Sequence, residues 1–338
     1  MAHRPTIAIS AGDPGGIGPE IVVKTLADRP LRSRAHFRIY GCVSALVDAA
    51  HAAAIEPFWW RIARGSTLLD TTLAHEVVVV DTPDAAPFPH QPTRAGGELS
   101  FRFVEDAIAD AKRPLGDPLH AHAVVTAPIS KTSWSLAGHA NFPGHTELFA
   151  HRFGAKRVAM LFHAGKLNVI LATVHIPLMD IRNHLTIGRV FDAIDLGNDA
   201  LKQLGISAPR IAVCGLNPHA GENGLLGDEE DRLIRPAIRA AKEAGIDAHG
   251  PFPADTVFNS LVRGDYDLVV AMYHDQGLIP IKLLAWDRAV NVTVGLPIPR
   301  TSPDHGTAFD IAGKNAANPG SMRAAIEAAL TLADHARR

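Results

Sequence analysis

The sequence predicts an α/β protein with a mixed sheet, on three observations. Short β-branched runs alternate with longer amphipathic stretches along the 338 residues, as in α/β domains. The runs Val158–Phe162 and Leu167–Val174 flank the turn His163–Lys166, which predicts an antiparallel hairpin. Hydrophobic residues make up 47% of the chain and charged residues 20%, so a large core can be buried and wholesale disorder is excluded.

The elements follow in order from these patterns. Thr6–Ser10 is the first expected strand, and Pro19–Ala27 is the first helix, where Pro19 is tolerated because its missing N–H would be unpaired in the first turn. Further strands are expected at Arg38–Gly41, Glu76–Asp81, Ala123–Thr126, Arg210–Cys214 and Leu268–Met272. Further helices are expected at Glu98–Lys112, Ile187–Leu204, Glu229–Ala244 and Ser321–Ala336. The proline-rich segment Asp81–Gly97 is interpreted as a surface excursion.

Charge and cysteine content exclude several classes of protein. Lys plus Arg number 33 and Asp plus Glu 35, and the net charge of −2 gives no sign of a nucleic-acid or membrane-surface binder. Cys42 and Cys214 are too few for a disulfide framework or a four-cysteine zinc site, and they suit a reducing compartment. The N-terminal apolar stretch is too short for a signal peptide, and no run approaches the ~20 apolar residues that span a bilayer. We therefore expect a soluble, cytoplasmic protein.

Two glycine-rich segments are candidates for ligand binding. Gly12–Glu20 joins the first strand to the first helix, where open α/β sheets place their ligand crevice. It lacks the Gly-Lys-Ser/Thr of a phosphate loop, and Ile21 stands where a dinucleotide fingerprint needs its third glycine. His305–Gly320 has the small residues of a loop wrapped around a planar or phosphorylated ligand. The simpler explanations are a tight turn for the first segment and a helix start with a turn for the second.

Three histidines, His175, His219 and His274, each follow a strand-like run. One edge of a sheet can gather such side chains, and three neutral imidazoles with an open fourth position are the ligand set of a Lewis-acid zinc or similar ion. The simpler explanation is three ordinary surface or core histidines, since the chain has 18. Asp255 and Asp275 are candidate carboxylate neighbours of this site.

A second group of residues suits an anion. Gly144–Glu147 opens a predicted helix, where N–H groups and the helix dipole favour a phosphate or carboxylate, although an ordinary N-cap would use the same residues. Lys282, Asn291 and Arg300 sit within or after apolar, strand-like segments. A single such cation is usually only solvated, but three polar groups so close in sequence favour a binding role. Lys131 is a weaker candidate.

Taken together and in this order, the segments resemble the 4-hydroxythreonine-4-phosphate dehydrogenase (PdxA-like) family. The matching strings are GDPGGIGPE, TAPISK, PGHTE, ATVHIPL, CGLNPHAGE, GPFPADT, MYHDQGLIPIK and NVTVGLPIPRTSPDHGTAFDIAG, and they run from Gly12 to Gly313. The two end segments are also similar to GDGIGPE and HGSAPDIAGKGIANP of isocitrate and isopropylmalate dehydrogenases. The resemblance implies their two-domain α/β/α fold with a cleft between the domains. The implied domains are a cofactor-side domain of residues 1–125 plus 285–338, and a metal, substrate and dimerisation domain of residues 126–284.

The resemblance also implies an activity. Family members oxidise a hydroxyl group beta to a carboxylate with NAD or NADP, and the resulting keto acid loses carbon dioxide. The implied reaction converts 4-phosphohydroxy-L-threonine into 3-amino-2-oxopropyl phosphate in pyridoxal phosphate biosynthesis. The family works as a homodimer, with the metal site shared between subunits.

Roles carry over to individual residues by motif. The implied ligands of a divalent metal (zinc, magnesium or cobalt) are His175, His219 and His274. The implied substrate-binding residues are His145, Thr146, Lys282, Asn291 and Arg300. The adenosine end of the cofactor is expected at His305, Gly306, Thr307, Ala308 and Asp310. Asp255 and Lys282 are the catalytic candidates, and a metal-bound water is the third candidate for the base that takes the hydroxyl proton.

One departure from the family pattern bears on the substrate. Gly15 stands where members that serve vitamin B6 synthesis often have alanine, and TAPISK is closer to paralogues. Those paralogues act on threonate or erythronate 4-phosphate, or on cyclic diols, and the GHTE and PRTS strings favour a phosphorylated substrate. The alternatives are therefore a D-threonate or D-erythronate 4-phosphate dehydrogenase and, from other classes, a metal-dependent hydrolase or a non-catalytic binder.

Overall fold

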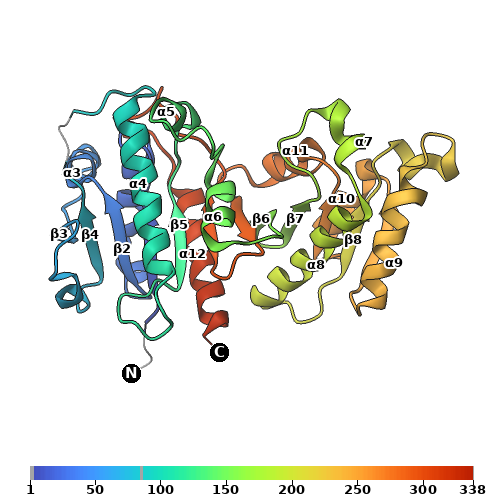
Figure 1. The fold of residues 1–338 in the computed structure, drawn as a ribbon, viewed down its shortest axis with the longest axis horizontal. Coiled ribbons are helices and arrows are strands. Elements are labelled where there is room, and N and C mark those ends of the chain that lie inside the picture. The colour runs from blue at the N-terminus through green and yellow to red at the C-terminus, as the bar shows by residue number, and fades with distance from the viewer. Residues whose placement is uncertain (1–3, 84–86, 338) are drawn as a thin grey trace. The chain divides into compact units, whose positions relative to one another are not determined.

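The computed structural model describes residues 4–83 and 87–337 and divides the chain into two compact units (Figure 1). Unit 1 contains Met1–Ala155 and Leu296–Arg338, and unit 2 is the continuous stretch Lys156–Gly295. The first unit is thus discontinuous, with its boundaries at Ala155 and Leu296 rather than at residues 125 and 285. The first boundary lies later than expected because the helix Lys131–Leu136 packs on unit 1 and because Leu148 and Phe149 belong to the apolar core of that unit.

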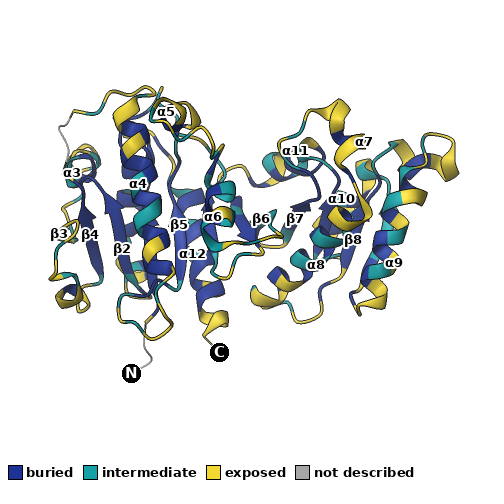
Figure 2. Cartoon of the chain, in the orientation of Figure 1, coloured by how far each residue is buried: buried dark blue, intermediate teal, exposed yellow. Residues whose placement is uncertain are grey.

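Among the described residues, unit 1 has six strands, and each pairs in parallel with its neighbours within the unit. Their order is β3-β4-β2-β1-β5-β12. The bounds are β1 Thr6–Ser10, β2 His36–Gly41, β3 Trp60–Ala63, β4 Val77–Asp81, β5 Ala123–Thr126 and β12 Arg300–Pro303. Strands β1, β4 and β5 are buried along their whole length, as expected of a parallel sheet covered on both faces, and Figure 2 shows this for β4 and β5.

Helices cover this sheet. They are α1 Gly18–Leu26, α2 Arg29–Arg32, α3 Val43–Ala52, η1 Leu69–Thr72, α4 Arg94–Ala111, α5 Lys131–Leu136, α6 His145–Phe153 and α12 Gly320–Ala336. The 18-residue helix α4 begins at Thr93, whose hydroxyl accepts the N–H of Gly96 at 2.9 Å. Phe103 and Val104 of α4 pack with Ala8 and Val124 of the sheet in one apolar core. Because side chains alternate along a strand, Ile7 and Val125 point to the opposite face.

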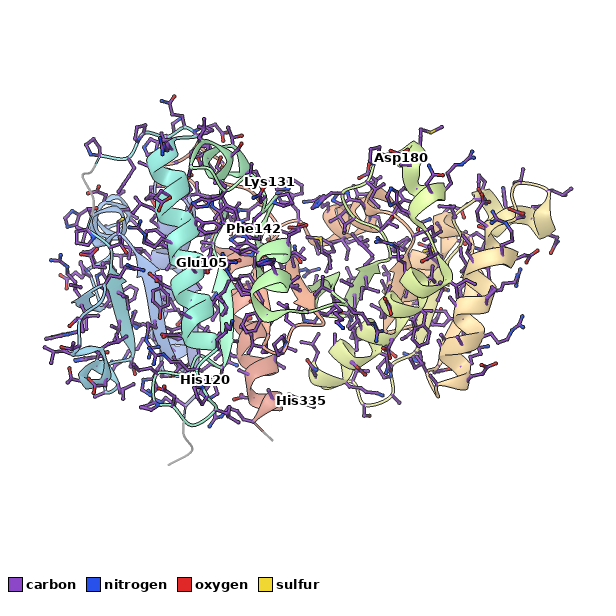
Figure 3. All side chains as sticks on the ribbon, viewed as in Figure 1. Glu105, His120, Lys131, Phe142, Asp180 and His335 are labelled. Carbon is purple, nitrogen blue, oxygen red and sulfur yellow. The ribbon has the colours of Figure 1, made fainter. Side chains whose placement is uncertain are left out.

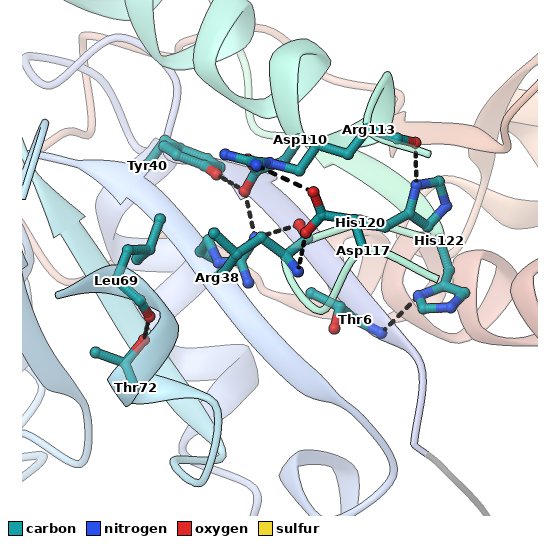
Figure 4. A network of polar contacts seen from close by, with 11 residues as sticks. Thr6, Arg38, Tyr40, Leu69, Thr72, Asp110, Arg113, Asp117, His120 and His122 are labelled. Atoms are coloured by element: carbon teal, nitrogen blue, oxygen red, sulfur yellow. Dashed lines mark hydrogen bonds and ion pairs between the residues drawn. The ribbon is translucent and has the colours of Figure 1, made fainter. Parts of the chain in front are cut away.

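A buried polar network closes the amino-terminal end of this sheet (Figure 4). Arg38 of β2 is 4% exposed and donates to the Asp110 carboxylate and to the carbonyl of Leu119, the latter at 2.8 Å. Tyr40 also donates to Asp110, and the Arg113 guanidinium binds its second oxygen at 2.8 Å. Both charges of the Arg38–Asp110 pair are therefore neutralised inside the protein, the condition under which a buried ion pair is tolerated.

Unit 2 has a mixed sheet, as the sequence predicts. The order is β11-β6-β7-β10-β8-β9. The bounds are β6 Ala159–Ala164, β7 Leu167–Leu171, β8 Ile211–Cys214, β9 Ala248–Phe252, β10 Leu268–Ala271 and β11 Val290–Val294. Strand β6 is antiparallel to both β7 and β11, so the expected hairpin is confirmed. Strands β7, β10, β8 and β9 are parallel.

The helices of unit 2 differ from expectation at two places. They are η2 Leu178–Asp180, α7 Ile181–His184, α8 Ile187–Gln203, η3 Pro218–Gly224, the π-helical turn η4 Glu230–Ile234, α9 Arg235–Glu243, α10 Ala254–Arg263 and α11 His274–Ala285. The single helix expected over Glu229–Ala244 is divided into η4 and α9, with Pro236 in the first turn of α9. The stretch before Lys282, expected to be strand-like, is helical. It belongs to α11, which continues through Pro280 to Ala285.

None of the helices in the described residues is both long enough and apolar enough to span a bilayer.

Candidate functional site

The glycine-rich loop after β1 is shaped by close backbone approaches in unit 1. Gly12 has φ +76°, and a Cβ there would lie 2.3 Å from the carbonyl oxygen of Pro128. A Cβ on Gly18 would lie 2.2 Å from the carbonyl oxygen of Ala11. Only glycine fits at these two positions, so the tight-turn explanation holds for part of this segment.

The same loop contacts the candidate cofactor loop. The N–H of Ile17 donates to the carbonyl of Thr307 at 3.0 Å, and a Cβ on Gly16 would lie 3.0 Å from that oxygen. The first and last motifs of the sequence therefore meet in unit 1. A cavity of about 190 Å³ opens beside them, between α1, α3 and His90, with Gly313 on its wall. Ala308, inside the loop, has φ +41°, a left-handed conformation that non-glycine residues rarely adopt.

Asp13 is the buried acidic group of the glycine-rich loop. It is 1% exposed, and its Oδ1 accepts the N–H of Gly15 at 3.1 Å. Burial raises the pKa of its carboxyl group, while hydrogen bonds from Gly15 and Ser133 act in the opposite direction. Among the described residues no hydrogen-bond partner reaches its Oδ2. A Cβ on Gly96 would lie 2.6 Å from Oδ1, so the carboxyl group rests against the start of α4.

Arg300 is a second buried cation of unit 1, besides Arg38. It is 2% exposed, donates to the Thr126 hydroxyl from Nη2 at 2.6 Å, and lies 5.8 Å from the centre of the Phe149 ring. Burial lowers its pKa to about 9, and Glu147 acts in the opposite direction, so the side chain remains a cation at neutral pH. A buried cation beside a hydroxyl is a suitable group for binding a phosphate or carboxylate.

His145 begins α6, as the sequence predicts for a helix start near Gly144. Its ring lies 5.6 Å from that of Trp134. Burial lowers the pKa of His145 well below 6.5, and the charges of Arg300 and Lys131 lower it further. Its Nε2 is buried and has no hydrogen-bond partner within the part of the chain that the structure describes. Lys131 is exposed at the first residue of α5 (Figure 3). Two cations thus act on this neutral imidazole.

The depressed pKa of His145 makes stability depend on pH. The folded protein keeps this imidazole neutral where the unfolded chain protonates it, so the contribution is complete above pH 6.5 and is lost as the pH falls below 6.5 toward the folded-state pKa. We expect the free energy of unfolding of His145→Asn to fall less steeply below pH 6.5 than that of the wild type. Denaturant titrations at several pH values measure this, with the exposed His335→Asn as control. Equal slopes for His145→Asn and wild type would contradict the assignment.

The three candidate histidines follow adjacent parallel strands of unit 2. His175 comes after β7, His219 after β8 and His274 after β10, and β10 pairs with both β7 and β8 in parallel. Their carboxyl ends therefore share one edge of the sheet. The rings of His175 and His274 have centres 5.8 Å apart. Two imidazoles on one tetrahedral ion, with metal–nitrogen distances of ~2 Å, have ring centres about 5 Å apart, so this spacing fits a shared ion.

His274 has a carboxylate partner. Its Nδ1 lies 2.7 Å from Oδ1 of Asp275, and the imidazole is 39% exposed. A carboxylate on Nδ1 fixes the proton there and leaves Nε2 as the metal-binding nitrogen, the arrangement common around zinc-bound histidines. His175 and His274 therefore present nitrogen donors of a kind that divalent cations bind. In residues 4–83 and 87–337, no group of three or more His, Cys, Asp or Glu side chains gathers as a metal cluster.

His219 lies in an unusual turn. Residues 219–223 all have positive φ, from 43° to 82°, and Gly221 is the only glycine among them. This is a turn of left-handed helix, which costs roughly 1–2 kcal/mol per non-glycine residue. Such strain persists only where the surroundings hold it, and it is common at functional sites. The imidazole of His219 is 66% exposed and lies 4.0 Å from the carboxylate of Glu222.

The remaining candidates are placed as follows. Asp255 is exposed in the first turn of α10, and Thr146 is half-buried in the first turn of α6. Lys282 lies on α11 with its Nζ 5.2 Å from the Trp286 ring centre. Asn291 is on β11 opposite Phe162, and no described residue bonds its buried Oδ1. His145, Thr146, Arg300 and the 305–310 loop thus belong to unit 1, while the three histidines, Asp255, Lys282 and Asn291 belong to unit 2.

Several residues that shape the site were not predicted. Thr126 and Trp134 contact Arg300 and His145, and Gln276 and Glu230 bind backbone groups next to the candidate histidines. Thr126 and Gln276 lie inside quoted motifs, TAPISK and MYHDQG, so the motifs were a signal that could have found them. Glu230 lies inside a helical pattern with no local feature that separates it from a surface glutamate.

Comparison with known proteins gives three concordant results. The family model described as "Pyridoxal phosphate biosynthetic protein PdxA" matches residues 35–329. The chain is 44% identical over 334 residues to 4-hydroxythreonine-4-phosphate dehydrogenase of Geobacter metallireducens, covering 98% of this chain and 96% of the relative. It is also 44% identical over 335 residues to D-threonate 4-phosphate dehydrogenase of Salmonella typhimurium, covering 97% and 99%. The solved structure of 4-hydroxythreonine-4-phosphate dehydrogenase from Klebsiella pneumoniae superposes with a TM-score of 0.82 at 41% identity, covering 97% of this chain and 99% of that one. The predicted two-domain α/β fold is thereby confirmed.

Proposed function

Because the chain belongs to the PdxA family, we propose that it is an NAD(P)-dependent dehydrogenase that oxidises a small phosphorylated 3-hydroxy acid with the help of a divalent metal ion. The relatives compared above are named dehydrogenases, so the hydrolase and the non-catalytic binder are not retained. The substrate we propose is 4-phosphohydroxy-L-threonine, which is converted to 3-amino-2-oxopropyl phosphate. D-threonate or D-erythronate 4-phosphate is the alternative, since the chain is equally identical to a D-threonate 4-phosphate dehydrogenase.

The observation that carries the proposal is the buried guanidinium of Arg300 in unit 1. Arg300 has little contact with water, and Lys131 and the start of α6 lie on the same unit. The substrate phosphate or carboxylate would receive hydrogen bonds from the Arg300 guanidinium and from the free N–H groups of α6. His145 is neutral there and supplies a donor without adding charge. Thr146 stands in the first turn of α6, and Lys282 and Asn291 provide polar groups on unit 2.

The metal would be held by the imidazoles of unit 2. His175 and His274 have a suitable ring spacing, Asp275 orients His274, and His219 is the third proposed ligand. A divalent ion of zinc, magnesium or cobalt type supplies Lewis-acid chemistry that lowers the pKa of a bound hydroxyl group. The base that receives the hydroxyl proton would be a side chain of unit 2, and Asp255 and Lys282 are our candidates.

The cofactor is proposed to lie on unit 1. The loop from His305 to Asp310 is held against the glycine-rich loop by the Ile17–Thr307 hydrogen bond, beside the cavity near His90. Gly16 lets the two loops approach closely, and the adenosine end of NAD or NADP would lie along His305, Gly306, Thr307, Ala308 and Asp310. The protein's part is to orient the nicotinamide and exclude water, since hydride acceptance belongs to the cofactor.

We also propose that the enzyme is a cytoplasmic homodimer with the metal site shared between subunits. Helix α11 exposes Ile279 at 59% and Leu283 at 79%, Trp286 directly after it is 73% exposed, and Met179 of η2 is 83% exposed. Monomeric proteins rarely expose so many large apolar side chains on one unit, and such surfaces are typical of subunit contacts. Helix α11 also begins at His274, so a partner that covers it would lie close to the proposed ligands.

The decisive experiment measures turnover with defined substrates. We expect reduction of NAD or NADP, with release of carbon dioxide in equal amount, from 4-phosphohydroxy-L-threonine or from D-threonate or D-erythronate 4-phosphate. Thorough chelation should abolish the reaction, and zinc, magnesium or cobalt should restore it. Turnover that is indifferent to metal removal, or equally fast with the unphosphorylated acids, would contradict the proposal.

A further inference from the structure

A chain of buried hydrogen bonds connects the three segments that carry the candidate histidines in unit 2. The segments are the ends of β7, β10 and β8, which lead to His175, His274 and His219. None of the bonds involves a histidine side chain. These hydrogen bonds therefore link the backbone segments that carry the three imidazoles.

The first link joins the segments of His175 and His274. Thr173 is 1% exposed, and its hydroxyl donates to the carbonyl oxygen of Met272 at 2.6 Å. Met272 is fully buried, two residues before His274. The hydroxyl of Thr173, two residues before His175, thus fixes the spacing of these two backbones.

The second link joins the segments of His274 and His219 through one side chain. Gln276 is 8% exposed, and its Oε1 accepts the N–H of Met272 at 2.6 Å. Its Nε2 donates to the carbonyl oxygen of Gly215 at 2.9 Å. Both backbone groups of Met272 are therefore hydrogen-bonded: Thr173 donates to its carbonyl oxygen, and Gln276 accepts from its N–H. Gln276 is the side chain that bridges the ends of β10 and β8.

The third link holds the left-handed turn itself. Glu230 is 2% exposed, and its Oε1 accepts the N–H groups of Leu216 and Asn217, each at 2.8 Å. Its Oε2 accepts from the side-chain amide of Asn217 at 3.0 Å. This buried carboxylate receives charge-assisted hydrogen bonds at the entrance of the turn that carries His219. Gln276 fixes Gly215, and Glu230 fixes the next two residues, so the start of the left-handed turn is held relative to β10.

We propose that Gln276 is a positioning residue, which sets the separation of the His274 and His219 segments and so pre-organises the metal-binding imidazoles. The inference rests on the metal site of the proposed function. Both segments belong to one chain, so the link acts whether the third imidazole comes from that chain or from its partner. Residues that orient metal ligands from behind typically contribute ~10–100-fold to metal affinity.

A purely structural role would have a different consequence. Methionine has nearly the volume of glutamine and would fill the same space, so a residue that only packs would tolerate it. The Nε2 donor is needed only for the bond to Gly215. Gln276→Glu keeps the acceptor for the Met272 N–H and places an oxygen against the Gly215 carbonyl, so it isolates the link to the His219 segment.

The test compares cobalt binding by three full-length variants and the wild type. Gln276→Met and Gln276→Glu are the variants of interest, and the exposed Gln203→Met at the end of α8 is the matched control. Co²⁺ is titrated into metal-free protein by calorimetry and by its visible absorption, which reports ligand geometry. Melting of the metal-free proteins is measured in parallel. We expect ~10–100-fold weaker binding and a changed spectrum for both Gln276 variants, and wild-type behaviour for Gln203→Met.

The outcomes distinguish failure of the positioning role of Gln276 from failure of the proposed metal site. If both Gln276 variants bind Co²⁺ with wild-type affinity and spectrum, the positioning role is wrong, even if their metal-free melting temperatures fall. If the wild type binds no Co²⁺, or if His274→Ala binds it as tightly as the wild type does, the metal site of the proposed function is wrong and this inference is overturned with it.

Discussion

Replacing His274 with alanine is expected to lower the turnover number on the order of 10³-fold, because Lewis-acid stabilisation by a bound metal contributes several kcal/mol. The melting temperature of the metal-free protein should change by no more than about 2 °C, since the side chain is 39% exposed and adds little to the core. Steady-state kinetics with saturating metal and thermal melting without metal measure the two effects.

His249 offers a closely matched control in the same unit. Its Nε2 lies 2.6 Å from the carboxylate of Asp247, and its side chain is 42% exposed, so it too is a half-exposed imidazole paired with an aspartate. His249→Ala should keep wild-type turnover. Equal turnover by the two variants would contradict a role of His274 in metal binding. A large fall in the melting temperature of metal-free His274→Ala would show that its side chain stabilises the fold.

The second large effect is expected at Arg300. Arg300→Met should raise the KM for the phosphorylated substrate ~100-fold, because charge-assisted hydrogen bonds to an anion contribute about 2–3 kcal/mol. The free energy of unfolding should stay the same or increase, since replacing a buried cation by an apolar side chain of similar volume is often neutral or stabilising. Inorganic phosphate should raise the melting temperature of the wild type more than that of the variant.

Arg38 separates this effect from the loss of any buried arginine. It is as buried as Arg300 and lies in the same unit, but its guanidinium binds the buried carboxylate of Asp110. Arg38→Met removes the buried guanidinium from that carboxylate and leaves only Tyr40 and the less buried Arg113 beside it, so we expect destabilisation of about 3 kcal/mol with an unchanged KM. Should Arg300→Met instead lose stability and keep its KM, the guanidinium would be a structural group and the anion site would be misplaced.

The regular elements could be predicted because their signals are local. Strand β1 has the predicted bounds Thr6–Ser10, and α8 differs from its prediction by one residue, since β-branched runs and amphipathic periods are visible in short windows. The apolar segment around Lys282 is interpreted as strand-like, but it is part of helix α11, whose interior contains Pro280, a residue that disfavours helices. Tertiary packing overrides that preference: the helix lies on β7, where a Cβ on Gly277 would come within 2.7 Å of Leu171.

The candidate site was predictable only where the interacting residues lie close together in one short motif. His274 and Asp275 are adjacent, so their contact follows from the sequence. The contact of Gln276 with Gly215 joins residues 61 positions apart, and that of Arg300 with Thr126 joins residues 174 apart. No local pattern encodes such distances. The left-handed turn at His219 was also not predictable, because Ala220 and Glu222 belong to types that seldom adopt positive φ.

The discontinuity of unit 1 has a consequence for biosynthesis. Strand β12 pairs with β5, and α12 packs on both strands and on α1, yet these segments are translated after all of residues 156–295. The ribosome therefore completes unit 2 before it synthesises β12. During this interval the edge of β5 that pairs with β12 is unpaired. Unpaired strand edges are prone to aggregation in this interval, so slow translation or a truncation before β12 should make the amino-terminal half dependent on chaperones.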